Sequence, residues 1–101
     1  LIGADLTDAF MDNVIFRNVN LENVTLENVR LIDADLTNTN LTNANLRNSI
    51  LADANLTNAI LREADLTNAV LSGANLHGAN LENAILTGTI LNCKNHPICE
   101  D

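Results

Sequence analysis

The stretch from Ala34 to Leu86 decides the fold, and it reads ADLTN TNLTN ANLRN SILAD ANLTN AILRE ADLTN AVLSG ANLHG ANLEN AIL. Leucine recurs every five residues in this stretch, beginning at Leu36. A small residue, most often Ala, precedes each of these leucines by two positions, and Asn, Asp or Gly follows nearly all of them by two. A repeat this regular is analysed first, because a missed period leads to the wrong fold.

The five-residue period fits neither an α-helix nor a continuous β-strand. Apolar residues on one face recur about every 3.6 residues in a helix and about every 2 residues in a strand. We therefore interpret each repeat as a short extended piece followed by a turn. The small residue and the central leucine then point inward, and the residue between them points outward with the next two.

Turn-forming residues predict one corner in each repeat. The corner position, two residues after each central residue, holds Asn, Asp or Gly in nearly every repeat from Gly3 to Gly88. Glu63 is an exception, and Cys93 occupies the last such position. Asn, Asp and Gly tolerate positive φ or bond their own backbone in turns. Four corners close a square, so the chain should form between four and five coils of about 20 residues each.

The tandem pattern of a small residue, Asp or Asn, Leu or Phe, a small polar residue or Arg, and any fifth residue resembles the pentapeptide repeat family. The pattern covers Leu1 to Leu91. The resemblance implies an all-β fold, namely a right-handed quadrilateral parallel β-helix, and parallel crossovers are in general right-handed. The Leu-rich centres are similar to those of cyanobacterial and chloroplast members. We expect the β-helix to span 1–91 and a C-terminal capping tail to span 92–101.

The central residues of the repeats form the predicted core. It includes Met11, Phe16, Leu36, Leu46, Leu56, Leu66, Leu76 and Leu86. Met11 and Phe16 are the centres that are not leucine, and we interpret them as a local change of packing, because narrow solenoid interiors are filled by side chains. Thr39, Ser49 and Thr89 occupy inward positions, where we expect each hydroxyl to bond a backbone carbonyl.

The composition limits the partners of the chain. Its 101 residues suit one domain, and its formal net charge is −8 at pH 7. This acidity argues against nucleic-acid binding, which needs clustered Lys and Arg, and against an anionic membrane surface. No apolar run is long enough for membrane insertion. The chain starts at Leu1, already in phase with the repeat, which favours a fragment or a processed chain.

The tail from Asn92 carries both cysteines, and three states are open for them. We favour a disulfide between Cys93 and Cys99 over free thiols. A metal site of Cys93, His96 and Cys99, completed by Asp101, is the third reading, although structural zinc normally takes four strong ligands. A disulfide would indicate an oxidising compartment such as the periplasm or thylakoid lumen, whereas free thiols would fit the cytoplasm.

One outward column differs from the others in polarity. Positions one coil apart on one side of the square hold Phe10, Arg30, Ile50, Val70 and Ile90. Scattered apolar residues are normal on protein surfaces, but a contiguous patch tends to mark a contact. We therefore predict an interaction stripe for a protein partner that the sequence does not identify, and a homodimer through this stripe is one candidate.

The sequence predicts a non-enzymatic structural or protein-interaction module with no cofactor and no metal. It offers no nucleophile with a base in register, no carboxylate pair and no phosphate loop. Asp33 and Asp53 are expected to stack one coil apart, but the Gly-rich repeat that binds calcium in other solenoids is missing. The resemblance suggests an alternative, because some family members mimic the shape and charge of DNA and act on a DNA-binding enzyme such as gyrase.

Overall fold

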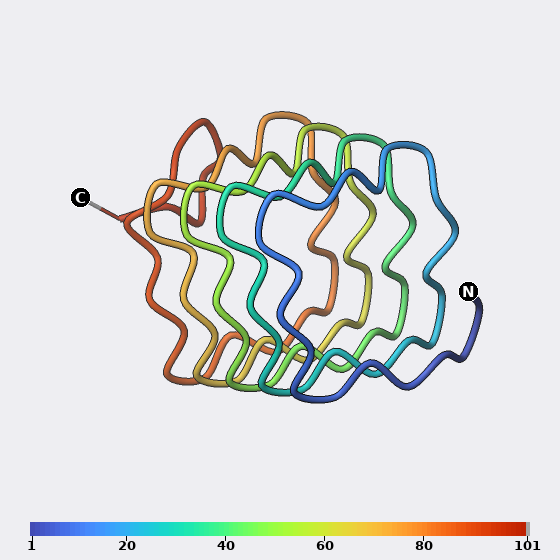
Figure 1. The fold of residues 1–101 in the computed structure, drawn as a ribbon. Coiled ribbons are helices and arrows are strands. Elements are labelled where there is room, and N and C mark those ends of the chain that lie inside the picture. The colour runs from blue at the N-terminus through green and yellow to red at the C-terminus, as the bar shows by residue number, and fades with distance from the viewer. Residues whose placement is uncertain (101) are drawn as a thin grey trace.

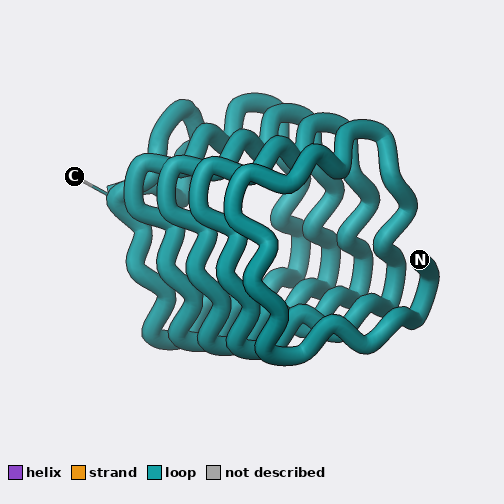
Figure 2. Tube along the Cα trace, in the orientation of Figure 1, coloured by secondary structure: helices purple, strands orange, loops and turns teal. Residues whose placement is uncertain are grey.

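The computed structural model describes residues 1–100, so Asp101 of the expected tail lies outside the described residues. The chain winds as a stack of square coils, with the N-terminus at one end of the rod and the C-terminus at the other (Figure 1). The molecule measures 32 × 26 × 23 Å along its principal axes. Within residues 1–100 no helix and no extended strand forms, and Figure 2 shows loops and turns throughout. Single bridge residues recur at every fifth position up to Ile90.

Parallel bridges hold consecutive coils together. Every bridge except the last, Asn75 to Lys94, joins a residue to the one twenty positions later, as in the column Asp5, Thr25, Asn45, Asp65 and Ile85. Three further columns begin at Phe10, Ile15 and Asn20, so every side of the square has one bridge residue per coil. These bridges confirm the coil of about 20 residues that the five-residue period predicts and the parallel β-helix that the family resemblance implies. The strands stay one bridge long because a corner interrupts each of them.

The corners are tight turns with one left-handed residue each. Every fifth residue from Gly3 to Gly88 has positive φ, between 58° and 72°. The N–H that follows bonds back to the central carbonyl, as Ala54 N–H does to Leu51 O at 3.1 Å. A positive φ at the third residue alone is the pattern of a type II turn. Even Glu63 adopts φ 60°. The regular spacing of the corners therefore outweighs the low preference of glutamate for a left-handed turn position.

The hydrogen bonds between coils have a direction. The N–H groups of Leu46 and Asn48 donate to the carbonyls of Asp65 and Thr67 in the next coil, at 2.8 and 2.9 Å. In the opposite direction, Asp65 N–H donates to Ala44 O at 2.9 Å. Each regular repeat thus sends two N–H groups toward the C-terminal end of the rod and one toward the N-terminal end.

The interior is a dry column of leucine and small residues. Leu36, Leu46, Leu56, Leu66 and Leu76 are fully buried. Met11, Phe16 and Leu86 are only partly buried, although they pack against the same core. They lie in the first and last coils, which have a neighbouring coil on one side only. Burial of the central residues therefore depends on stacking, since a coil alone would leave its leucines exposed.

The tail leaves the repeat at its last corner. Asn75 bridges to Lys94, one residue short of a full coil, and Cys93 has no positive φ. The sequence register, which put Cys93 at a turn corner, is therefore wrong there. With the corner omitted, the Cys93 side chain lies inward and is 8% exposed. Ile98 and Cys99 also pack against the core.

We predict that Leu76→Ala destabilises the fold by about 2–5 kcal/mol, because it leaves a cavity in a filled interior. The neighbouring change His77→Ala should have little effect, since the His77 side chain is exposed. Urea melts of the two variants and wild type, followed by circular dichroism, would measure the difference. Equal losses at the two positions would contradict the inward and outward assignment.

Candidate interaction face

The predicted stripe forms one continuous column on the surface. Bridges join its residues in sequence, in the order Phe10, Arg30, Ile50, Val70 and Ile90. Phe10 is 81% exposed and Ile90 is 49% exposed, whereas the three residues between them are partly buried by their neighbours. We call these five residues the apolar stripe. It runs from the first coil to the last, parallel to the rod axis.

Arg30 does not place a free charge in the apolar stripe. Its Nη2 donates to Asp12 Oδ2 at 2.8 Å, and its guanidinium carbon lies 5.5 Å from the centre of the Phe10 ring. The cation therefore has a carboxylate on one side and an aromatic face on the other. The aliphatic part of Arg30 can then extend the apolar surface between Phe10 and Ile50.

The surface around the C-terminal half of the apolar stripe carries no formal charge. Residues 66–72 and 86–92, which form this side in two successive coils, include no Asp, Glu, Lys or Arg. Charge instead gathers toward the N-terminal half, where residues 1–40 contain seven acids and two arginines. The stripe is not the location of all exposed apolar side chains, because Ile15, Ile60 and Ile85 lie one on each of the other three sides.

Sequence reasoning missed a recurring polar pair on the outer surface. Oδ1 of Asp35 accepts hydrogen bonds from the N–H and the hydroxyl of Thr37, at 3.1 and 2.6 Å. The same two bonds recur at Asp5–Thr7, Asn40–Thr42, Asn55–Thr57 and Asp65–Thr67. These bonds satisfy the N–H of the residue that follows the central leucine, such as Thr37, which no carbonyl of a neighbouring coil reaches. The Asp/Asn-Leu-Thr spacing in the sequence is the signal that identifies these turns.

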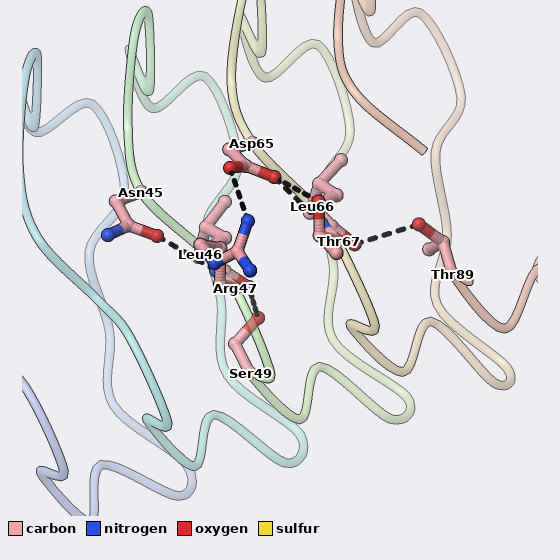
Figure 3. A network of polar contacts seen from close by, with 8 residues as sticks. All are labelled: Asn45, Leu46, Arg47, Ser49, Asp65, Leu66, Thr67 and Thr89. Carbon is pink, nitrogen blue, oxygen red and sulfur yellow. Dashed lines mark hydrogen bonds and ion pairs between the residues drawn. The ribbon is translucent and has the colours of Figure 1, made fainter. Parts of the chain in front are cut away.

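The pKa values of three of these aspartates are lowered. The hydroxyl of Thr37 lowers the pKa of Asp35, and that of Thr7 lowers the pKa of Asp5, because both stabilise the carboxylate. At Asp65 burial acts to raise the pKa, but the bonds from Thr67 and Arg47 outweigh it and the pKa is lowered. Figure 3 shows Asp65 between Arg47 and Thr67.

The arginines link neighbouring coils. Each pairs with an acid one coil away, in Arg17–Asp35, Arg30–Asp12, Arg47–Asp65 and Arg62–Glu82, at 2.8 to 3.5 Å. Such partly exposed pairs contribute little to stability. They do, however, use all four arginines of the chain, so that within residues 1–100 no cluster of unpaired cations forms that would suit a phosphate.

The inward hydroxyls have the backbone partners that the sequence predicts. Thr39 Oγ1 donates to Phe16 O at 2.6 Å, and Ser49 Oγ donates to Leu46 O at 2.7 Å. Thr89 Oγ1 donates to Leu66 O at 2.7 Å, and Figure 3 shows both Ser49 and Thr89. The expectation of a structural role is confirmed at all three positions. Each hydroxyl proton is donated to a backbone carbonyl.

The tail closes on itself through a disulfide. Cys93 and Cys99 are bonded, with their Cα atoms 5.0 Å apart. His96 Nδ1 accepts the N–H of Ile98 at 3.3 Å, so Nε2 is the donor to Ala79 O at 3.0 Å. Cys93, His96 and Cys99 are thus engaged in other bonds, and Asp101 lies outside the described residues. Among residues 1–100 no group of three metal-binding side chains forms.

The described part of the chain offers no enclosed ligand site. No pocket opens on the surface of residues 1–100. The same residues contain no helix with the length and apolarity required to cross a membrane. What the rod presents to another molecule is therefore its four flat sides and its two ends.

Comparison with protein families gives a match over most of the chain. The model for pentapeptide repeats matches residues 1–31, 15–53, 30–61 and 49–88. A search of the curated proteins finds no match.

Three solved structures show how widely the same fold occurs. A pentapeptide repeat protein from Nostoc PCC 7120 is 39% identical, with a TM-score of 0.76 over 78% of this chain and 68% of that one. One from the Arabidopsis thaliana thylakoid lumen is 23% identical, with a TM-score of 0.91 over 96% and 68%. HetL of Nostoc sp. strain PCC 7120, which is involved in heterocyst differentiation regulation, is 27% identical, with a TM-score of 0.81 over 92% of this chain. This chain spans 47% of HetL.

We predict that the lowered pKa values of Asp35 and Asp65 make the fold sensitive to acid. A depressed pKa in the folded state gives stability that is present above the ordinary value of 3.8 and is lost as the pH falls through the folded value. Asp35→Asn with Asp65→Asn should flatten this loss, because Asn40 and Asn55 show that an amide makes the same bonds.

Thermal melts between pH 7 and pH 2 would follow this loss in wild type and in the double variant. Asp33→Asn is the matched control, since it removes a carboxylate that bonds no threonine. If the control flattens the acid limb as much as the double variant does, the aspartate–threonine bonds are not its cause.

Proposed function

Because the chain belongs to the pentapeptide repeat family, we propose that it is a non-enzymatic interaction module whose apolar stripe binds a protein partner. The module is a right-handed quadrilateral β-helix of between four and five coils. The supporting observation is the unbroken column from Phe10 to Ile90, in which the one cation, Arg30, is neutralised by Asp12.

The energy for binding comes from burying the stripe. An aliphatic or aromatic side chain gains about 1.5–3 kcal/mol when it passes from full exposure to full burial. Phe10 and Ile90 have much of that area still available, and Ile50 and Val70 have a part of it. The flat surface of a coil stack suits another flat surface, because the bridges hold the stripe residues in a fixed line.

A second copy of the chain is the partner that the charges favour. Two molecules of formal net charge −8 repel each other unless they meet where charge is absent. The uncharged surface of residues 66–72 and 86–92 is such a place, and it contains Val70 and Ile90. A two-fold contact would be isologous, so each copy would contribute the same part of the stripe.

The disulfide supports an oxidising compartment, such as the periplasm or the thylakoid lumen. In the same proposal, residues 1–91 are the β-helix and residues 92–101 are its cap. The cap is supported by the packing of Cys93, Ile98 and Cys99 against the last coil.

Ile50→Lys with Val70→Lys tests the contact face. We expect wild type to dimerise with increasing concentration and the variant to remain monomeric with an unchanged circular dichroism spectrum, since both side chains lie on the outer surface. Ile60→Lys with Ile85→Lys is the matched control, because it adds two charges on other sides of the rod. Light scattering over a range of concentrations gives the masses. A wild type that stays monomeric throughout would rule out the homodimer.

DNA mimicry is the second candidate, and the charge distribution favours it. The excess of acids gathers in residues 1–40, and every arginine already has an acidic partner. A rod of this kind could occupy the DNA-binding groove of an enzyme such as gyrase. If so, the protein should inhibit supercoiling of a relaxed plasmid at low salt and lose the effect as salt rises. Supercoiling that is unchanged at a large excess of the protein would exclude this candidate.

A further inference from the structure

The apolar stripe shares its side of the rod with a second outward column. The coils lie in register along the rod, so each side is a stack of parallel segments (Figure 2). Backbone bonds join the second column from coil to coil, as Gly73 N–H donates to Asn92 O at 2.9 Å. The residues of this second column are Asp12, Ile32, Ala52, Ser72 and Asn92. The two columns and the corners beside them form what we call the stripe side.

The formal charge of the stripe side decreases along the rod. Each coil contributes one segment to this side, and the segments are 8–13, 28–33, 48–53, 68–73 and 88–93. The first two segments together contain three acids and one arginine, and the third contains a single acid, Asp53. The last two contain no Asp, Glu, Lys or Arg. One half of the stripe side is therefore acidic, and the other half is uncharged.

Two copies that meet through the stripe side can take two orientations. If the two-fold axis runs along the rods, the rods are parallel, and in a centred contact the apolar stripe of one copy lies opposite the second column of the other. If the axis runs across the rods, the rods are antiparallel, and each column lies opposite its own counterpart. The antiparallel contact therefore places stripe against stripe over the full width of the side.

The charges favour the same orientation. Parallel rods would place segments 8–13 and 28–33 opposite the same two segments of the other copy, so that three acids would meet three acids. Antiparallel rods place them opposite the uncharged segments 68–73 and 88–93. Like charges that face each other across an interface oppose binding. Asp53 lies in the middle segment and meets its own copy in either orientation, so it does not decide between them.

We propose that two copies of this chain associate side by side and antiparallel, with Ile50 at the two-fold axis. The proposal rests on the contact face proposed above and adds its orientation and register. Phe10 of each copy then packs against Ile90 of the other, and the aliphatic part of Arg30 packs against Val70 of the other. The contact is isologous and closes with two copies.

The register follows from the segments. If the axis lay half a coil nearer the N-terminus, segment 28–33 would face segment 48–53, and both contain an acidic corner. If it lay half a coil nearer the C-terminus, Phe10 would have no regular segment opposite it, because the bridges of the described chain end at Lys94. Ile50 at the axis is the register that pairs each acidic segment with an uncharged one.

The ion pair in the stripe side is suited to face an uncharged segment. Asp12 Oδ2 accepts from Arg30 Nη2 at 2.8 Å, and Asp12 Oδ1 accepts from Ile32 N–H at 3.1 Å. Both carboxylate oxygens thus have donors within their own chain. Because a carboxylate that is already bonded loses less on leaving water than an unpaired one does, Asp12 can lie opposite Asn92 of the second copy.

Charge at position 92 tests the orientation by its sign. Asn92 is exposed, and the proposed register places it opposite Asp12 and near Asp33 of the second copy. Asn92→Lys should therefore lower the dissociation constant of the dimer about two- to thirtyfold, since two partly exposed ion pairs form in each dimer. Asn92→Asp should raise the dissociation constant. In parallel rods the two positions 92 would lie in the same row, so either charge would repel its own copy.

His77→Lys is the matched control, because it changes the net charge equally at an exposed position on another side of the rod. Analytical ultracentrifugation gives the dissociation constants. If Asn92→Lys does not lower the constant below that of His77→Lys, the antiparallel orientation is overturned.

A zero-length cross-link tests the register in the Asn92→Lys variant. A carbodiimide joins an amine to a carboxylate that touches it, and peptide mass spectrometry identifies the joined residues. We expect a covalent dimer in which position 92 is joined to Asp12 or Asp33. Within one molecule these residues are three to four coils away, at least about 14 Å along the rod, so the link must join two copies. Dimers that never contain either link would overturn the register.

The outcomes separate this proposal from the contact face on which it rests. A wild type that stays monomeric at every concentration overturns both. If instead wild type dimerises and Ile50→Lys with Val70→Lys abolishes the dimer, the contact face stands. A dimer of that kind that Asn92→Lys fails to strengthen overturns the antiparallel arrangement alone.

Discussion

The structure depends on one backbone constraint, a left-handed residue at every fifth position. A turn of this kind redirects the chain after one short side, so the spacing of the corners fixes the length of a side and the size of a coil. It also fixes the phase. Between the corners Asn43 and Asn48 there is room for one inward pair, Ala44 and Leu46, and two outward residues, Asn45 and Arg47. Burial, bridge pairing and the four flat sides all follow from that spacing.

Those features of the fold that follow from the five-residue period could be predicted from the sequence. The inward phase, the stacked columns and even the corner at Glu63 could be read from the five-residue spacing alone, because stacking on neighbouring corners overrides the preference of one residue. The corner at Cys93 could not, since the step from Asn75 to its bridge partner Lys94 is one residue shorter than a regular coil. The partial exposure of Met11 and Phe16 also depends on a missing neighbour, which a repeat pattern does not describe.

Polar residues on the outer surface mostly serve the backbone. The aspartate–threonine pairs satisfy turn N–H groups, and the arginines join acids across coils, so these side chains were visible in the sequence while their bonds were not. This use of polar groups leaves the uncharged part of the apolar stripe as a surface without internal partners. An interaction there can form without breaking any bond that holds the rod together.

A regular repeat does not by itself determine how many coils stack. The bonds that attach one coil to the next are the same bonds that would attach one molecule to another, and nothing in a regular repeat distinguishes the two cases. The distinction must come from residues that break the pattern. In this chain those residues lie between Asn92 and Glu100, where a corner is skipped, a proline removes a donor, and a disulfide fixes the result. Within the described residues the tail is thus the segment least like the rest, and the one in which the regular stacking of bridges ends.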